Sequence, residues 1–163
     1  MPTTVSDPSL CMTIQTILTP GRVYMDVPGT SKKKILEFVA ERMSLEVPTV
    51  NSAELFDALI TRERLGTTGL GSGIAIPHCR FKQCPVPTGL FLRTEQGVDY
   101  DSVDRLPVDL VFALIVPDGD NQEHLSLLQA LANRFRSGQV VNELRQASSE
   151  SALYNILIRD ELN

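Results

Sequence analysis

The sequence predicts a single α/β domain, a sandwich in which helices flank both faces of a mixed, central β-sheet of about five strands. Three observations predict this fold. Short apolar segments alternate along the chain with segments of helical periodicity. The run from Leu110 to Val116 is apolar at every position, as expected for a central strand covered on both faces. A length of 163 residues is typical of one domain, so residues 1–163 are expected to form one unit.

The first half of the chain is predicted to contain a short helical turn, one strand and two helices. The turn is predicted by three apolar residues at helical spacing: Ile14, Ile17 and Leu18. Alternating apolar residues from Arg22 to Val27 predict an edge strand. Ser31 opens a long helix, with Lys32 to Lys34 on its solvent side. A second helix is predicted from about Ser52 to Arg64.

A glycine-rich loop and three strands are predicted next. The loop, Gly66 to Gly73, holds four of the ten glycines, and a short strand follows from Ile74 to Ile76. The other strands are predicted at Val86 to Arg93 and at Val108 to Val116. Between them, the polar stretch from Gln96 to Pro107 predicts a loop with one helical turn.

Three helices are predicted in the rest of the chain. Asp120 is the expected N-cap of a strong helix that extends to Ser137 and ends at Gly138. Two shorter helices are predicted at Val140 to Ala147 and at Ser151 to Ile158. The alternation of strands with these helices favours one layered α/β unit.

Composition and charge disfavour several classes of protein. The 15 basic and 20 acidic residues give a net charge of −5, which disfavours a general binder of nucleic acid or anionic membrane. The longest apolar run is far shorter than the ~20 residues of a membrane helix. No Lys or Arg precedes Arg22, so the basic start of a secretory signal is missing. The three cysteines are too few and too unevenly spaced for a disulfide framework: Cys11, Cys79 and Cys84. We therefore expect a cytoplasmic protein that binds no nucleic acid and has no membrane span.

His78, one of only two histidines, is the centre of the candidate chemistry. It directly follows Pro77, whose fixed φ near −65° makes the turn that presents the imidazole stiff. The glycines let the backbone of Gly69 to Gly73 come close to another molecule. An imidazole beside a bare backbone suits an approaching phosphoryl group or another protein. No nucleotide site is expected, because the loop has no lysine and its glycines follow a helix rather than a strand.

His124 and the arginines around the glycine loop are candidates to act with His78. His124 falls in the first turn of the last long helix, either as a partly buried helix-start residue or as part of an anion-favouring corner. That corner would face His78 if the strands Ile74–Ile76 and Leu110–Val116 are neighbours. Arg62, Arg64 and Arg80 flank the glycine loop and His78. An arginine at the helix end just before the loop could fold over and clamp a phosphoryl oxygen, although surface arginines are mostly solvated.

A zinc site is the competing hypothesis. His78, Cys79 and Cys84, with or without His124, would combine the imidazole and thiolate ligands that suit zinc. The spacing matches no standard zinc pair, however, and adjacent residues rarely ligate one tetrahedral ion well. We therefore expect neither a metal nor another cofactor.

Two stretches of the sequence resemble a known family. Thr61-Arg62-Glu63, followed by the string from Gly66 to His78, resembles the signature of the mannitol/fructose-type IIA domains of the bacterial phosphotransferase system. The string is most similar to that of the nitrogen-regulatory IIA proteins. Pro107 to Leu114, and then His124-Leu125, resemble the second motif of the family. The resemblance extends from about Ile14 to Leu162.

The resemblance implies a regulatory phosphocarrier. It implies that His78 accepts a phosphoryl group on Nε2 from an HPr-like phosphocarrier, with His124 and Arg62 stabilising that group. Cys79 departs from the glycine found in many members and removes some backbone freedom beside the nucleophile. The donor is expected to dock on a rim of small residues that includes Gly69, Gly71, Ser72 and Gly73.

The absence of a membrane span and of room for a further domain favours a stand-alone regulator over sugar uptake. Such a regulator would signal nitrogen, carbon or potassium status through its phosphorylation state, to targets such as kinases or transporters. Two alternatives stay open within the same fold. One is an interaction module that has lost phosphotransfer, and the other is a IIA component that serves sugar uptake.

Overall fold

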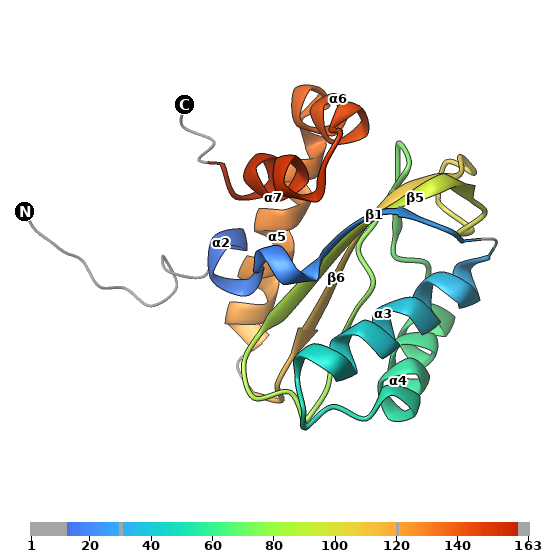
Figure 1. Ribbon diagram of the computed structural model, residues 1–163. Helices are drawn as coiled ribbons and strands as arrows, with labels where there is room; N and C mark the ends of the chain where they lie inside the picture. Colours follow the sequence, from blue (N-terminus) through green and yellow to red (C-terminus); the bar gives the residue numbers. More distant parts are fainter. Residues whose placement is uncertain (1–12, 30, 120, 160–163) are drawn as a thin grey trace, which may run out of the picture. The chain divides into compact units, whose positions relative to one another are not determined.

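Most of the chain is described in a computed structural model (Figure 1), which covers residues 13–29, 31–119 and 121–159. These residues form two compact units. The larger unit spans Arg22–Asp118, and the smaller one combines the parts of the chain before and after it. The predicted N-cap Asp120 and the first cysteine, Cys11, lie outside the described residues.

The larger unit contains a mixed six-stranded sheet with the order β1-β5-β6-β3-β2, in which β4 also pairs with β6. Its strands are β1 (Val23–Val27), β2 (Gly69–Gly71), β3 (Ile74–Ala75), β4 (His78–Arg80), β5 (Thr88–Val98) and β6 (Val108–Val116). As predicted, β1 lies at an edge and β6 is central, antiparallel to β5 and parallel to β3 and β4. The prediction of an α/β fold with a mixed sheet is confirmed.

The glycine-rich stretch is part of the sheet rather than a free loop. β2 and β3 form a hairpin whose two-residue turn, Ser72-Gly73, has φ values of 58° and 83°. Positive φ at both turn positions matches the right-handed twist of the flanking strands. A further short strand, β4, begins at His78, so the chain is paired with β6 on both sides of Pro77. These short strands raise the total above the expected five.

The loop predicted from Gln96 begins later than expected. β5 continues to Val98, which pairs with Val108 of β6 beyond a register shift that follows Arg93. The polar residues that suggested the start of a loop lie at this shift, within the continuous strand. No helix occurs between residues 99 and 107; the chain there forms a turn.

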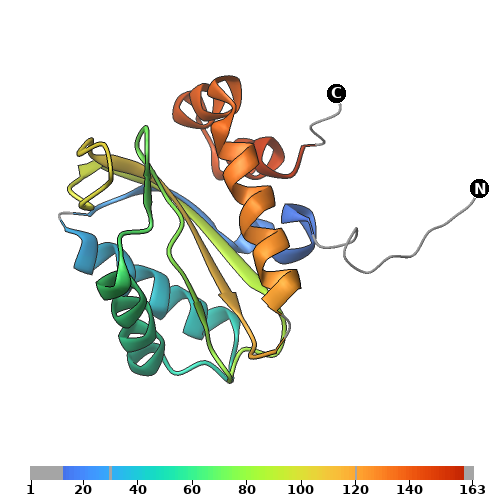
Figure 2. The same ribbon diagram turned by 180° about the vertical axis from the view of Figure 1, so that it is seen from behind.

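Two helices lie side by side on one face of the sheet (Figures 1 and 2). They are α3 (Lys32–Glu46) and α4 (Ser52–Leu65). Each is capped at its N-terminus by a side chain: Ser31 accepts from the N–H of Lys34, and Asn51 accepts from the N–H of Glu54. Their apolar stripes pack with alternate residues of the central strands, which are Leu90, Leu92, Val111, Ala113 and Ile115. Since this packing removes the side chains from water, it supplies most of the driving force that fixes α3 and α4 to the sheet.

The described part of the smaller unit is helical and contains α2 (Ile14–Ile17), α5 (Asn121–Arg136), α6 (Gly138–Gln146) and α7 (Glu150–Ile158). Gly138, expected to end the long helix, instead begins the next one, because Ser137 accepts from the N–H of Val140 and caps α6. A short 3₁₀ turn, Pro20–Arg22, leads into β1. None of the described helices is long and apolar enough to cross a membrane.

The close approach of the hairpin to Ser102 yields a test of the fold. A Cβ atom at Gly69 would overlap the buried side chain of Ser102 and lie 3.1 Å from its Cα. We expect Gly69→Ala to lower the free energy of unfolding by about 1–3 kcal/mol, measured by urea denaturation. Gly138→Ala is the control, because a Cβ there meets nothing within 4 Å and alanine favours a helix. Equal stability of the two variants would contradict the predicted overlap.

Candidate functional site

His78 is held at the start of β4 by its backbone and by its ring. It pairs with Leu114 of β6, whose N–H donates to the carbonyl of Pro77 at 2.9 Å. The ring Nδ1 lies 2.7 Å from the carbonyl oxygen of Ile76. Because a carbonyl only accepts, Nδ1 carries the ring proton, and the lone pair of the neutral imidazole is on Nε2. The local fold therefore selects one nitrogen as a nucleophile.

The surroundings of His78 favour the neutral ring. Partial burial is the main cause that lowers its pKa below 6.5, and the positive charge of Arg62 lowers it further. The hydrogen bond to Ile76 and the charge of Glu63 act in the opposite direction and are outweighed. A neutral ring at physiological pH is the form that can attack an electrophile.

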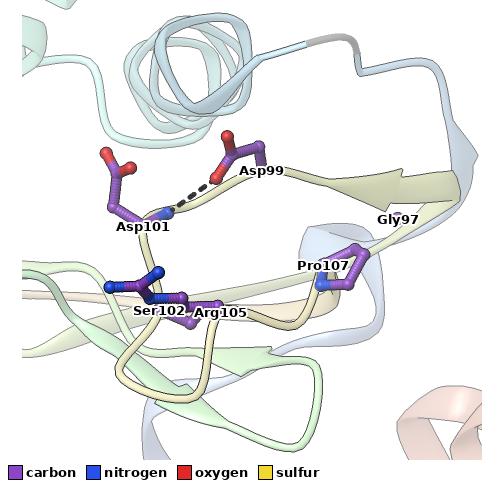
Figure 3. Close-up of a pocket in the computed structure, with 6 residues that line it drawn as sticks. All are labelled: Gly97, Asp99, Asp101, Ser102, Arg105 and Pro107. Atoms are coloured by element: carbon purple, nitrogen blue, oxygen red, sulfur yellow. Dashed lines mark hydrogen bonds between the residues drawn. The ribbon is translucent and has the colours of Figure 1, made fainter.

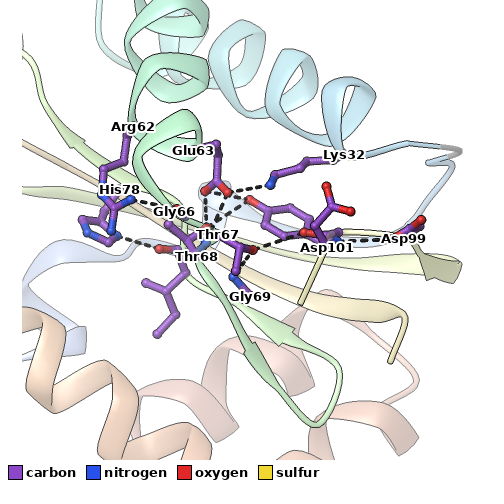
Figure 4. A network of polar contacts seen from close by, with 12 residues as sticks. Lys32, Arg62, Glu63, Gly66, Thr67, Thr68, Gly69, His78, Asp99 and Asp101 are labelled. Atoms are coloured by element: carbon purple, nitrogen blue, oxygen red, sulfur yellow. Dashed lines mark hydrogen bonds and ion pairs between the residues drawn. The ribbon is translucent and has the colours of Figure 1, made fainter. Parts of the chain in front are cut away.

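Arg62, the arginine that the family resemblance implied, lies beside His78 (Figure 4). It belongs to the last turn of α4, and its Nη1 donates to the carbonyl of Gly66 at 2.9 Å. This bond folds the side chain over the end of the helix and uses one of the five guanidinium donors. Arg62 thus supplies a fixed positive charge next to the imidazole.

A buried polar cluster adjoins Arg62, and the sequence did not predict it. The carboxylate of Glu63 accepts from the N–H of Thr68 at 3.1 Å, from the Thr68 hydroxyl at close range and from the hydroxyl of Tyr100 at 3.4 Å. The ammonium of Lys32 forms an ion pair with it at 2.8 Å (Figure 4). Lys32 was expected on the solvent side of its helix, and this expectation was wrong.

The sequence did contain a signal for this cluster. Leu55, Leu59 and Glu63 follow one another at intervals of four residues and are the buried residues of α4. Such spacing places a carboxylate on the core-facing side of the helix. Because a buried charge is costly without partners, donors were to be expected around it.

The β2–β3 hairpin is braced by the segment between β5 and β6. The N–H of Ser72 donates to Oδ2 of Asp104 at 2.7 Å, and the N–H of Leu106 donates to Oδ1 at 3.1 Å. These bonds lower the pKa of Asp104. Of the four predicted docking residues, Ser72 is exposed, and Gly69, Gly71 and Gly73 are buried. Leu70, between them, is 48% exposed, so the accessible part of the hairpin is Leu70 with Ser72.

His124 is placed on α5 of the smaller unit, where it is half-buried in the first turn of the helix. The predicted role of His124 depended in part on pairing between β3 and β6, and these two strands do pair. Ile74 is the register partner of Leu110, and Ala75 is that of Val111.

The two described cysteines belong to the apolar core. Cys79 is buried, and burial, with a smaller contribution from Cys84, raises its pKa to about 12. The thiol of Cys84 donates to the carbonyl of Val86 at 3.1 Å. A protonated thiol is a poor zinc ligand, since the thiolate binds metal. Within the described ranges, no group of three or more His, Cys, Asp or Glu side chains could hold a metal ion.

An open pocket of about 680 Å³ lies at the end of β5 (Figure 3). Its lining residues are Gly97, Asp99, Asp101, Ser102, Arg105 and Pro107. None of the predicted site residues lines it. The pocket therefore adds no group to the candidate site.

Similar proteins match the chain over most of its length. Residues 16–160 match the family model for the phosphoenolpyruvate-dependent sugar phosphotransferase system, EIIA 2. A nitrogen regulatory protein of Pseudomonas aeruginosa is 43% identical over 145 residues, covering 89% of this chain and 94% of that protein. The crystal structure of the nitrogen regulatory protein IIA-Ntr from Neisseria meningitidis is 37% identical with a TM-score of 0.84, covering 88% and 98%. Enzyme IIAMTL from Escherichia coli, solved with phosphorylated enzyme IIBMTL, shares the fold at 21% identity and a TM-score of 0.72, covering 86% and 96%.

The electrostatics of the site can be tested by titrating His78 with NMR. A lowered pKa means that the folded ring binds a proton less readily, so we expect a midpoint below 6.5. Arg62→Gln removes the neighbouring positive charge and should raise the pKa of His78. Arg64→Gln is the matched control, because it removes the same charge from an exposed position on the same helix. A wild-type midpoint above 6.5, or equal shifts in both variants, would contradict this account.

Proposed function

The chain belongs to the EIIA type 2 family of the phosphoenolpyruvate-dependent sugar phosphotransferase system, and we propose that it accepts a phosphoryl group on Nε2 of His78. The hydrogen bond between Nδ1 of His78 and the carbonyl of Ile76 carries this proposal, since it leaves Nε2 as the nucleophilic nitrogen. The donor is an HPr-like phosphocarrier that itself carries a phosphohistidine.

In the proposed transfer, the lone pair on Nε2 of His78 attacks the phosphorus atom. A new N–P bond forms as the N–P bond to the donor histidine breaks, and the electron pair of that bond returns to the donor ring. The proton on Nδ1 stays in its hydrogen bond to Ile76 and helps to bear the positive charge of the phosphorylated ring. Since the transferring group carries negative charge on its equatorial oxygens, the fixed guanidinium of Arg62 stabilises it.

The donor is proposed to approach over the β2–β3 hairpin. The exposed residues there are Leu70 and Ser72, and the buried glycines Gly69, Gly71 and Gly73 keep the backbone behind them compact. A partner histidine must come within a few ångströms of Nε2, so a low rim on the donor's approach suits docking. The tight turn keeps this rim small.

We assign the protein to the nitrogen-regulatory branch of the family. The similarity to nitrogen regulatory proteins, at 43% and 37% identity over nearly the whole chain, supports this assignment. Its proposed role is to report nitrogen, carbon or potassium status through the phosphorylation state of His78. Its targets would be regulatory proteins such as kinases or transporters.

The first test is phosphoryl transfer to His78→Ala. Incubation with a phosphorylated HPr-like donor should give wild-type protein an acid-labile, base-stable adduct, as expected for phosphohistidine. His78→Ala should stay folded and take up no phosphoryl group, because its only nucleophile for this step is gone. Stoichiometric labelling of the variant, mapped to another residue, would overturn the assignment.

The second test concerns His124, which we propose as a donor to the transferring phosphoryl group. Loss of one preorganised donor typically slows a reaction by about 10²–10³. We therefore expect His124→Ala to accept phosphate at His78, but more slowly by about this factor. His124→Gln restores a neutral N–H donor and should recover part of the loss. Equal transfer rates in wild type and both variants, each checked for folding, would show that His124 has only a structural role.

A further inference from the structure

We propose that Glu63 is a positioning residue for His78, which acts through Thr68 and the backbone of Ile76. The inference rests on the proposed function, because it concerns how the phosphoryl acceptor is aimed. The path consists of consecutive hydrogen bonds within the larger unit, and Figure 4 labels three of its residues, Glu63, Thr68 and His78.

The first link joins Glu63 to Thr68 at two points. One carboxylate oxygen accepts from the N–H of Thr68 at 3.1 Å, and the other accepts from its hydroxyl. Both residues are buried, so water does not compete with these bonds. A bond to the backbone and a bond to the side chain together fix the orientation of the Thr68 peptide group as well as its position.

The second link passes from Thr68 to the imidazole. The carbonyl of Thr68 accepts from the N–H of Ile76 at 3.0 Å, and the carbonyl of Ile76 accepts from Nδ1 of His78 at 2.7 Å. Ile76 lies between β3 and β4 and belongs to neither strand, and Pro77 after it has no N–H to donate. The orientation of the Ile76 carbonyl therefore depends on the bond from its own N–H to Thr68.

The charge on Glu63 is needed for this arrangement. An ionised carboxylate is an acceptor at both oxygens, and each group that it contacts can donate to it: the N–H and hydroxyl of Thr68, the hydroxyl of Tyr100 and the ammonium of Lys32. The ammonium of Lys32 also lies 4.7 Å from the centre of the Tyr100 ring. Burial raises the pKa of Tyr100, which keeps its hydroxyl protonated as a donor. An amide at position 63 would leave one acceptor oxygen in place of two and would remove the negative charge that pairs with Lys32.

The test compares two variants that each remove one hydroxyl donor from the same carboxylate oxygen. Thr68→Val removes a hydroxyl that belongs to the path to His78. Tyr100→Phe leaves every group of the path in place, although the lost hydroxyl also lies 3.2 Å from that of Thr68. The tautomer of His78 is read from the ¹⁵N shifts of its imidazole at a pH above its pKa. Phosphoryl uptake from a phosphorylated HPr-like donor gives the rate, and urea denaturation gives the stability of each variant.

We expect Thr68→Val to show a mixture of the two ring tautomers and slower uptake, by up to about a hundredfold. Tyr100→Phe should keep the wild-type tautomer and rate even where it costs equal stability. Thr68→Ser, which retains the hydroxyl, should restore both readouts. Glu63→Gln should reproduce the effect of Thr68→Val on the tautomer, provided that urea denaturation shows it folded.

The proposal is overturned if Thr68→Val keeps the wild-type tautomer and uptake rate, or if Tyr100→Phe changes them equally. These outcomes are separate from a failure of the proposed function. If wild-type protein takes up no phosphoryl group, the phosphocarrier role is wrong, and the tautomer measurement still decides whether Glu63 orients the ring.

Discussion

The buried carboxylate of Glu63 is the constraint on which the larger unit depends. A charge in this position must be met by donors, because desolvation without partners costs several kcal/mol. The donors come from separate segments: Lys32 begins α3, Thr68 precedes β2, and Tyr100 follows β5. One side chain on α4 thereby connects both helices to two loops. Packing alone would bring these segments together, but it would not specify the orientation of their peptide groups.

Adjacent residues at the end of α4 have opposite charges and separate tasks. Arg62 folds toward Gly66 and His78 and lowers the pKa of the imidazole, whereas Glu63 faces the core and acts in the opposite direction on that pKa. The difference follows from the helix, since consecutive side chains project about 100° apart. A helix end can therefore place a cation beside an imidazole while the next residue anchors the surrounding backbone.

Much of the fold could be predicted from the sequence, because the spacing of apolar residues along the chain indicates which segments form helices and which form strands. The apolar stripes of α3 and α4 and the unbroken apolar run of β6 correctly predicted two helices and a central strand. The short strand β2 and the end of β5 were missed, since a tight turn and a register shift are settled by pairing with distant residues. The six-stranded sheet therefore exceeded the expected count.

Within the candidate site, the local neighbours of His78 were predictable and the distant ones were not. Arg62 and the glycines lie near it in sequence, and their positions followed from the motif. Lys32 was misassigned to solvent because its partner, Glu63, is on another helix. Tyr100, in a segment expected to be an ordinary polar loop, carried no signal that could connect it to α4. Only the spacing of Glu63 with Leu55 and Leu59 pointed toward the cluster.

The number of residues that connects β3 to β4 determines where the imidazole of His78 emerges. The hairpin returns the chain so that the N–H of Ile76 meets the carbonyl of Thr68, and His78 follows two residues later. Because neighbouring residues of an extended chain project to opposite sides, a residue added or deleted between Ile76 and His78 would reverse the side on which the imidazole emerges. Exposed side chains before it, such as those of Leu70 and Ser72, can be exchanged by an engineer, but the length of this connection cannot be altered without redirecting the imidazole of His78.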